Sequence, residues 1–176
     1  MIKKILILDY GLGNIMSLKN AIIKIGFKPC LYSKVRNINS FKVMIIPGVG
    51  SFNKASLLFK NKNLFKIIKE FKAANKKIIG ICLGMQLMLN FGNENKKSKG
   101  LNFIDGYADV VNNKIKLPIV GWYDTYFLNK KFKEFNKKKF YYFHSFAPKK
   151  VKKKNTLCVN RFEKINYTSG LIDKNL

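Results

Sequence analysis

The sequence predicts an α/β fold with a mostly parallel central sheet flanked by helices, and antiparallel strands in its C-terminal part. In the first half of the chain, short runs rich in Ile and Leu alternate with segments whose apolar residues recur at helical spacing, as in β-α-β units. In the second half, short segments rich in aromatic and β-branched residues follow one another directly, which indicates antiparallel strands. The 176 residues, 47% of them hydrophobic, predict a single domain over residues 1–176.

The first expected strand covers residues 3–9, where the apolar side chains do not alternate with polar ones, as in a strand covered on both faces. Asn14 is expected to cap a helix over residues 15–25, and Gly26 to end it. The other strands of this half are expected at residues 27–33, 43–46 and 77–81, and the other helices at residues 51–59, 64–74 and 83–91.

A polar stretch over residues 91–100 predicts a loop between the two halves. After it, strands are expected at residues 107–111, 115–120, 123–128 and 139–146, with Asn112-Asn113 as a hairpin turn. Residues 156–162 and 165–169 are expected to form a final hairpin.

The net charge of +26 would by itself suggest a nucleic-acid partner. All 35 basic residues except Arg36 and Arg161 are lysine, however, and no binding motif accompanies them. Nucleic-acid surfaces favour arginine for its two-pronged contacts, so we interpret the lysines as a solvated coat and expect no nucleic-acid partner. The same charge can help to hold an acidic partner or a phosphorylated substrate.

Three cysteines, Cys30, Cys82 and Cys158, are odd in number and widely spaced, which fits neither a disulfide framework nor a zinc site. No apolar run is long enough to span a bilayer. The apolar run near the start ends at Asp9 and is too short for a signal peptide. We therefore expect a cytoplasmic protein with no bound metal and no membrane partner.

The stretch Gly80-Ile81-Cys82-Leu83-Gly84 lies where the expected strand over residues 77–81 meets the helix that follows. A Gly-x-Cys-x-Gly sequence at such a junction is the cysteine form of the nucleophile elbow. Free N–H groups and the helix dipole would favour the thiolate there and could bind an oxyanion. The alternative is a buried structural cysteine between a core strand and a helix.

Pro47-Gly48-Val49-Gly50-Ser51 follows the strand over residues 43–46, at the sheet edge where α/β proteins bind ligands. The loop could hold a phosphate, but it lacks the Lys-Ser/Thr ending of a P-loop. We expect it to present backbone N–H groups to a neighbouring site, a simple tight turn being the alternative. Gln86 lies one helical turn after Cys82 and could contact a polar substrate or be an ordinary exposed glutamine.

Five motifs occur together in one order: 9-DYGLGN-14, 47-PGVG-50, 80-GICLGMQ-86, 121-GW-122 and 143-FHSF-146. This combination resembles the class I (triad) glutamine amidotransferases and, more closely, the glutaminase subunits of imidazole glycerol phosphate synthase. The resemblance covers residue 1 to about residue 170. It implies a reaction that needs no cofactor.

The resemblance implies that Cys82 is the nucleophile, which attacks glutamine and forms a glutamyl thioester. It implies an oxyanion hole formed by the backbone of Leu83, Val49 and Gly50. Contacts to L-glutamine are implied for a further set of residues: Gly48, Gln86, Glu94, His144, Ser145 and Phe146.

The implied partner is a (β/α)8-barrel cyclase subunit, which forms a heterodimer with the glutaminase. Ammonia from glutamine passes through the barrel to a nucleotide intermediate of histidine biosynthesis. Relatives that supply ammonia for amidino sugars of surface polysaccharides also fit the N-terminal motif, so the resemblance leaves that pathway open.

The sequence departs from the family where a histidine and, two residues on, a glutamate should activate the cysteine near the C-terminus. His144 is the only histidine, and it aligns with the substrate-pocket stretch. Phe146 replaces a tyrosine, and Val120 a histidine. Three explanations are open: a truncated gene or record, a catalytically impaired scaffold subunit, or His144 acting as base. We expect little glutaminase activity, and exposed apolar area where a last strand and helix would cover the sheet.

Overall fold

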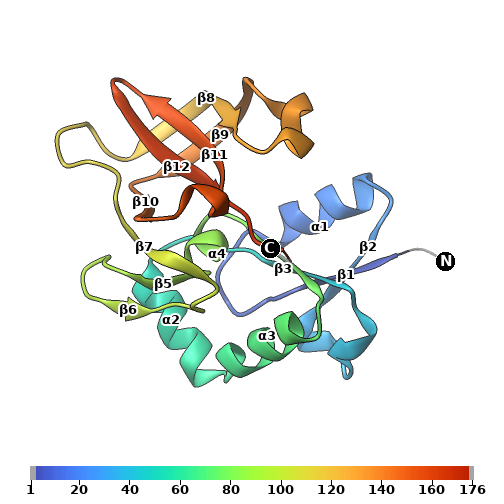
Figure 1. Cartoon of the computed structure of the whole chain (residues 1–176). Coiled ribbons are helices and arrows are strands. Elements are labelled where there is room, and N and C mark those ends of the chain that lie inside the picture. Colours follow the sequence, from blue (N-terminus) through green and yellow to red (C-terminus); the bar gives the residue numbers. More distant parts are fainter. Residues whose placement is uncertain (1–2, 175–176) are drawn as a thin grey trace.

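The computed structural model describes residues 3–174 and has a parallel four-stranded sheet in its N-terminal half, in the order β2-β1-β3-β4 (Figure 1). The expected strands are confirmed; β3 has the predicted bounds and the other three are shorter than predicted. Their bounds are Lys4–Ile7 for β1, Lys28–Leu31 for β2, Val43–Ile46 for β3 and Lys77–Gly80 for β4. The ends of β1, β3 and β4 therefore meet at one edge of the sheet, where the glycine-rich turns begin.

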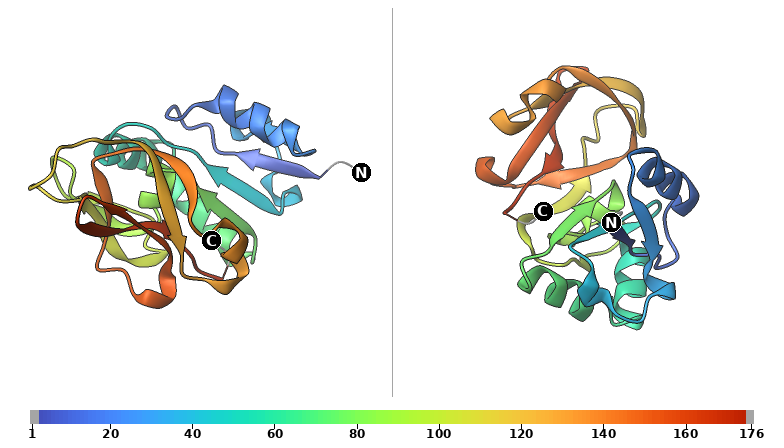
Figure 2. Two further views of the ribbon diagram at one scale, coloured as in Figure 1. Left: turned by 90° about the horizontal axis from the view of Figure 1, so that it is seen from above. Right: turned by 90° about the vertical axis from the view of Figure 1, so that its right-hand side faces the viewer.

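Helices cover both faces of this sheet (Figure 1, Figure 2). The helix α1 (Ile15–Lys24) packs on Ile5, Ile7 and Ile45. The other two, α2 (Phe52–Asn61) and α3 (Leu64–Ala73), pack on side chains that point the opposite way, such as Leu6 and Met44. The unbroken apolar runs in the sequence are explained by this burial on two sides.

The expected helix ends are confirmed for α1. The side chain of Asn14 accepts a hydrogen bond from the backbone N–H of Ser17 at 3.1 Å, and Gly26 takes the left-handed conformation (φ +81°) just after the helix. Ser51 caps α2 in the same way through the N–H of Lys54.

Two further four-stranded sheets form the C-terminal half, with the orders β10-β7-β5-β6 and β12-β11-β8-β9. The second of these lies above the parallel sheet in Figure 1. Their bounds are Leu89–Gly92 for β5, Ser98–Lys99 for β6, Ile104–Val110 for β7, Ile119–Phe127 for β8, Lys138–His144 for β9, Phe146–Lys149 for β10, Thr156–Phe162 for β11 and Ile165–Leu171 for β12. The final hairpin is confirmed by the antiparallel pairing of β11 with β12.

The prediction of one helix over residues 83–91 was wrong. Helix α4 contains only Leu83–Gln86, and β5 follows it. Leu87, Met88 and Leu89 are all buried, which a one-sided helix cannot achieve, and β5 instead pairs with β7. The predicted loop over residues 91–100 also contains the end of β5 and all of β6.

Pairing between distant segments changed three other predictions. Asn112-Asn113 does not join a hairpin, because β7 pairs with β5 and β10. The strands predicted at 115–120 and 123–128 are one strand, β8, which begins after Pro118, a residue with no N–H to donate to a ladder. The predicted strand at 139–146 divides at Ser145 into β9 and β10, which join different sheets.

β4 is one of the two outer strands of the parallel sheet among residues 3–174, and β2 is the other. Ile79 and Ile81, on and just after this strand, are 47% and 43% exposed. Apolar side chains are therefore exposed at this edge of the sheet.

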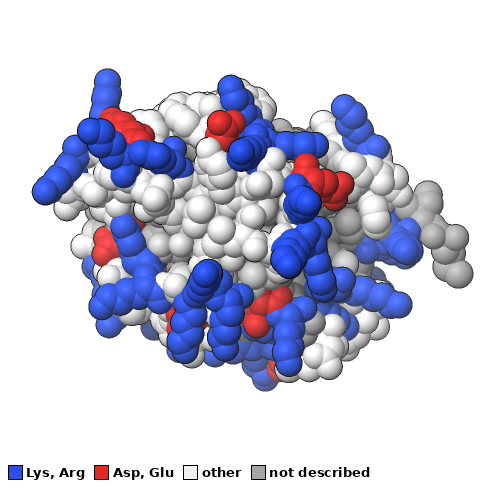
Figure 3. Space-filling model, turned by 45° about the horizontal axis from the view of Figure 1, so that its top comes forward, with Lys and Arg blue, Asp and Glu red and all other residues white. Residues whose placement is uncertain are grey.

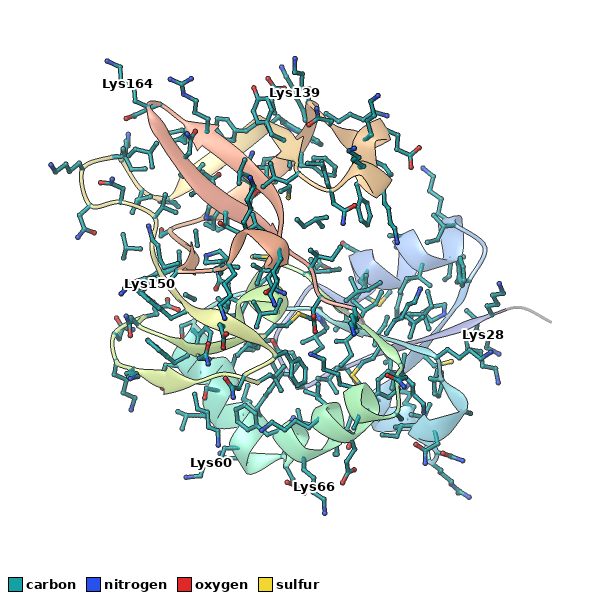
Figure 4. The ribbon with its side chains drawn as sticks, viewed as in Figure 1. Lys28, Lys60, Lys66, Lys139, Lys150 and Lys164 are labelled. Atoms are coloured by element: carbon teal, nitrogen blue, oxygen red, sulfur yellow. The ribbon has the colours of Figure 1, made fainter. Side chains whose placement is uncertain are left out.

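The lysines are dispersed, as expected for a solvated coat. On the face shown in Figure 3 they surround a largely uncharged centre, with a few acidic groups among them. The six lysines labelled in Figure 4 point outward from different parts of the molecule. They are Lys28, Lys60, Lys66, Lys139, Lys150 and Lys164. Within residues 3–174, no helix is long and apolar enough to cross a membrane.

Candidate active site around Cys82

Cys82 lies on the sharp turn between β4 and α4, as the elbow motif predicts. Its backbone has φ +54° and ψ −114°, a region that residues with a side chain rarely adopt and that costs on the order of 1–3 kcal/mol. Cys82 is nevertheless exposed, while Leu83 after it is buried. A strained turn that presents a thiol to solvent is typical of a nucleophile, and the buried structural cysteine is excluded.

The flanking glycines allow this turn because no side chain fits there. A Cβ on Gly80 would lie 2.6 Å from the backbone N of Met85, and one on Gly84 would collide with the carbonyl oxygen of Ile46. The elbow therefore packs directly against the end of β3.

The loop of residues 47–50, which follows β3, lies against the elbow. A Cβ on Gly48 would be 2.8 Å from both the backbone N of Gly84 and the Cβ of Leu83. Val49 is 54% exposed, and Gly50 has a φ of +97° with open space where a Cβ would be. The loop therefore approaches the elbow closely at Gly48.

The pKa of the Cys82 thiol differs from the expectation, which was a stabilised thiolate. Burial on the protein side of Cys82 raises the pKa of its thiol, and a hydrogen bond from the backbone N–H of Leu83 lowers that pKa by less. Helix α4 has only four residues, so its dipole is small. The free thiol is the main form at neutral pH.

Gln86 is 8% exposed and its Nε2 donates to the carbonyl oxygen of Phe146 at 3.0 Å. The Nδ1 of His144 lies 3.1 Å from the same oxygen. The structure therefore brings together Gln86, His144 and Phe146, which are distant in sequence, at the break between β9 and β10.

His144 is not poised to act as a base. Because a carbonyl oxygen only accepts, Nδ1 must carry the proton, and Nε2 accepts from the hydroxyl of Tyr167 at 3.2 Å. Burial lowers the pKa of His144, so the ring is neutral at pH 7. Both ring nitrogens are in use.

A cavity of about 680 Å³ opens beside Cys82, between β4 and the sheet that contains β9 and β12. Four predicted site residues line it: Cys82, Gln86, His144 and Phe146. The other six, Gly48, Val49, Gly50, Leu83, Glu94 and Ser145, are outside its lining. The walls are largely apolar, with the exposed side chains of Ile79 and Ile81 on one of them.

Glu94 and Ser145 contact backbone groups. The Oε2 of Glu94 accepts a hydrogen bond from the N–H of Phe52 at 2.6 Å, at the start of α2. The carbonyl oxygen of Ser145 accepts from Val111 at 2.9 Å. Within residues 3–174 no group of His, Cys, Asp and Glu could hold a metal ion.

Sequence reasoning missed two tyrosines at this site. Tyr10 is buried and its hydroxyl donates to the carbonyl oxygen of Pro47 at 3.0 Å. Tyr167 contacts His144. Tyr10 is inside the motif 9-DYGLGN-14, which could have marked it, but no local pattern marks Tyr167.

The backbone strain at Cys82 predicts an inverted order of stability. We expect Cys82→Gly to have a free energy of unfolding about 1 kcal/mol above that of Cys82→Ala, because glycine adopts positive φ freely. Urea denaturation measures it. At Lys69, exposed in α3, the alanine variant should be the more stable by a similar amount. Equal stability of the two Cys82 variants would show that the turn is unstrained.

The raised pKa of Cys82 predicts slow alkylation at neutral pH. The thiolate is the nucleophile, so the rate with iodoacetamide should increase with pH, with a midpoint above that of free cysteine. The rate is followed on the Cys82 peptide by mass spectrometry, in a Cys30→Ser background. A midpoint near or below pH 7 would contradict the effect of burial.

The comparisons with known proteins agree with this geometry. The model of the class-I glutamine amidotransferase family matches residues 6–175. The HisH subunit of imidazole glycerol phosphate synthase from Saccharolobus solfataricus is 35% identical over 149 residues, which cover 82% of this chain and 72% of that protein. HisH 2 from Methanococcus maripaludis is 34% identical over 178 residues, with 98% and 87% covered.

Solved structures show the same fold. The structure of PurLQS from Thermotoga maritima has a TM-score of 0.71 at 18% identity, covering 99% of this chain and 84% of that one. A crystal structure of a glutamine amidotransferase has a TM-score of 0.68 at 12% identity, with 97% and 90% covered. The resemblance read from the motifs is confirmed, and the chain belongs to the class-I glutamine amidotransferases.

Proposed function

We propose that this chain is the glutaminase subunit of an imidazole glycerol phosphate synthase. The observation that carries the proposal is the strained, exposed Cys82, whose sulfur accepts a hydrogen bond from the N–H of Leu83. The thiolate of Cys82 attacks the side-chain amide carbon of glutamine. The C–N bond then breaks, and the NH2 group takes up a proton and leaves as ammonia. Water then hydrolyses the glutamyl thioester to glutamate.

The oxyanion that forms during this attack is proposed to bind the N–H groups of Leu83 and of Val49 or Gly50. The contact of Gly48 with Gly84 and Leu83 supports this placement. Glutamine is proposed to contact a wider set of residues, namely Gly48, Gln86, Glu94, His144, Ser145 and Phe146. The two hydrogen bonds to the Phe146 carbonyl oxygen support a fixed pocket wall there.

The proposed reaction needs a group that takes the proton of the Cys82 thiol and one that protonates the leaving ammonia. His144 is its only histidine, and the Nε2 of that ring accepts from Tyr167. We therefore propose that the 176-residue chain reacts at Cys82 but hydrolyses glutamine slowly. An impaired scaffold that only binds the partner is the alternative, and the labelling experiment below separates the two.

The proposed partner is a (β/α)8-barrel cyclase subunit in the cytoplasm. The names of the curated relatives, each a subunit of imidazole glycerol phosphate synthase, support a partner subunit. The exposed face of β8 and β9, where Tyr141 and Phe143 also line the cavity beside Cys82, offers a docking surface. Trp122 and Phe143 on it are 66% and 65% exposed, and Tyr141, at 57%, packs edge-on against Trp122. Exposed aromatic clusters of this kind are enriched at the centres of protein interfaces.

Glutamine recognition is tested with the chloromethyl ketone analogue of glutamine. The thiolate adds to the ketone carbon, which puts negative charge on the ketone oxygen. The carbonyl then re-forms as the sulfur moves to the neighbouring carbon and displaces chloride, which leaves a thioether. We expect saturable labelling of Cys82 that is faster than labelling with iodoacetamide. L-glutamine should slow this labelling, and D-glutamate should not. Mass spectrometry of the Cys82 peptide measures it, and Cys82→Ala is the blank. Labelling that glutamine does not slow would favour the impaired scaffold.

Partner binding is tested at Trp122. Trp122→Ala should weaken binding to the cyclase subunit of the same organism by about 30-fold, the effect of losing a central aromatic side chain. Isothermal titration calorimetry gives the Kd, and thermal melting checks the fold. Leu57→Ala, which changes a 48% exposed residue of α2, is the matched control and should bind normally. An equal Kd for both variants would exclude this face as the interface.

A further inference from the structure

We infer that Tyr10 is a positioning residue that orients the loop of residues 47–50 towards Cys82. The inference rests on the proposed oxyanion role of that loop. Its first support is the hydrogen bond of 3.0 Å from the Tyr10 hydroxyl to the carbonyl oxygen of Pro47.

The geometry of a peptide group explains how one hydrogen bond can orient the loop. The C=O of Pro47 and the N–H of Gly48 belong to one planar trans unit, in which they point in opposite directions. Holding the carbonyl therefore fixes the plane from which the loop departs. The next two peptide groups carry the N–H groups of Val49 and Gly50, which are proposed to bind the oxyanion.

Tyr10 is itself held firmly. The side chain is 1% exposed, and its ring packs edge-on against Phe59 with 4.9 Å between centroids. The Nζ of Lys62 donates to the backbone oxygen of Tyr10 at 3.0 Å. The hydroxyl therefore has little freedom to follow a moving loop, and the loop must adapt to it.

The turn after β1 completes the support. Gly13 has a φ of +127°, and a Cβ there would lie 2.9 Å from the Cβ of Pro47. A Cβ on Gly48 would be 3.0 Å from the Tyr10 hydroxyl. The motif 9-DYGLGN-14, which has no part in the proposed chemistry, thus contacts the base of the loop at two points.

The far end of the loop is anchored independently. The carboxylate of Glu94 accepts a hydrogen bond from the N–H of Phe52 at 2.6 Å. The peptide groups of Val49 and Gly50 consequently lie between two fixed points. The exposed side chain of Val49 and the open surroundings of Gly50 leave them free to turn once one anchor is lost.

Burial raises the pKa of the Tyr10 hydroxyl, and the charge of a Cys82 thiolate raises it further. The hydroxyl is therefore protonated, and able to donate, throughout the pH range of any assay.

Tyr10→Phe tests the inference, because it removes the hydroxyl and keeps the ring on Phe59. Cys82 of the full 176-residue chain is labelled with the chloromethyl ketone analogue of glutamine and, separately, with iodoacetamide, which needs no oxyanion hole. We expect the limiting rate with the ketone to decrease about tenfold or more, with little change in half-saturating concentration and in the iodoacetamide rate.

Tyr123→Phe is the matched control, since the Tyr123 hydroxyl also donates to a backbone carbonyl oxygen, that of Val120 at 3.1 Å. It should label as the unchanged chain does. Equal labelling of Tyr10→Phe and the unchanged chain by the ketone would overturn the inference and leave the proposed function intact. A proportional loss with both reagents would also overturn it, since the elbow itself would then have changed. Absence of saturable ketone labelling in the unchanged chain would instead refute the proposed function.

Discussion

The contact between the 47–50 loop and the elbow is the constraint on which the rest of the site depends. It exists because Gly48 and Gly84 have no side chains: a Cβ on either would be too close to the other segment or to the end of β3. The parallel pairing of β3 with β4 brings the two turns to one edge of the sheet. The strain of Cys82 is then maintained by packing on both sides, with the core beneath it.

Features that depend on local sequence could be predicted. The strand that ends at Gly80, the turn at Cys82 and the cap at Asn14 each follow from residues within a few positions of one another. The second half could not be predicted to the same degree, because several of its strands pair with segments that are far away in the sequence. Residues 87–91 have a helical pattern, yet burial of three successive side chains and pairing with β7 make β5 a strand.

The candidate site divides in the same way. The motifs identified Cys82, the loop and Gln86, but the shared carbonyl of Phe146 and the hydroxyl of Tyr167 appear only in three dimensions. The shift in the pKa of the Cys82 thiol was predicted in the wrong direction, because the sequence suggested a long helix with a strong dipole. The structure has a four-residue helix instead, and burial has the larger effect.

We propose that Cys82 and the 47–50 loop form one acyl-transfer site. A crystal structure of the chain after reaction with the chloromethyl ketone analogue of glutamine tests it most directly. We expect the ketone oxygen of the Cys82 adduct to lie about 3 Å from the N–H of Leu83 and from that of Val49 or Gly50. An adduct whose oxygen points into the apolar cavity beside β4, away from both N–H groups, would contradict it.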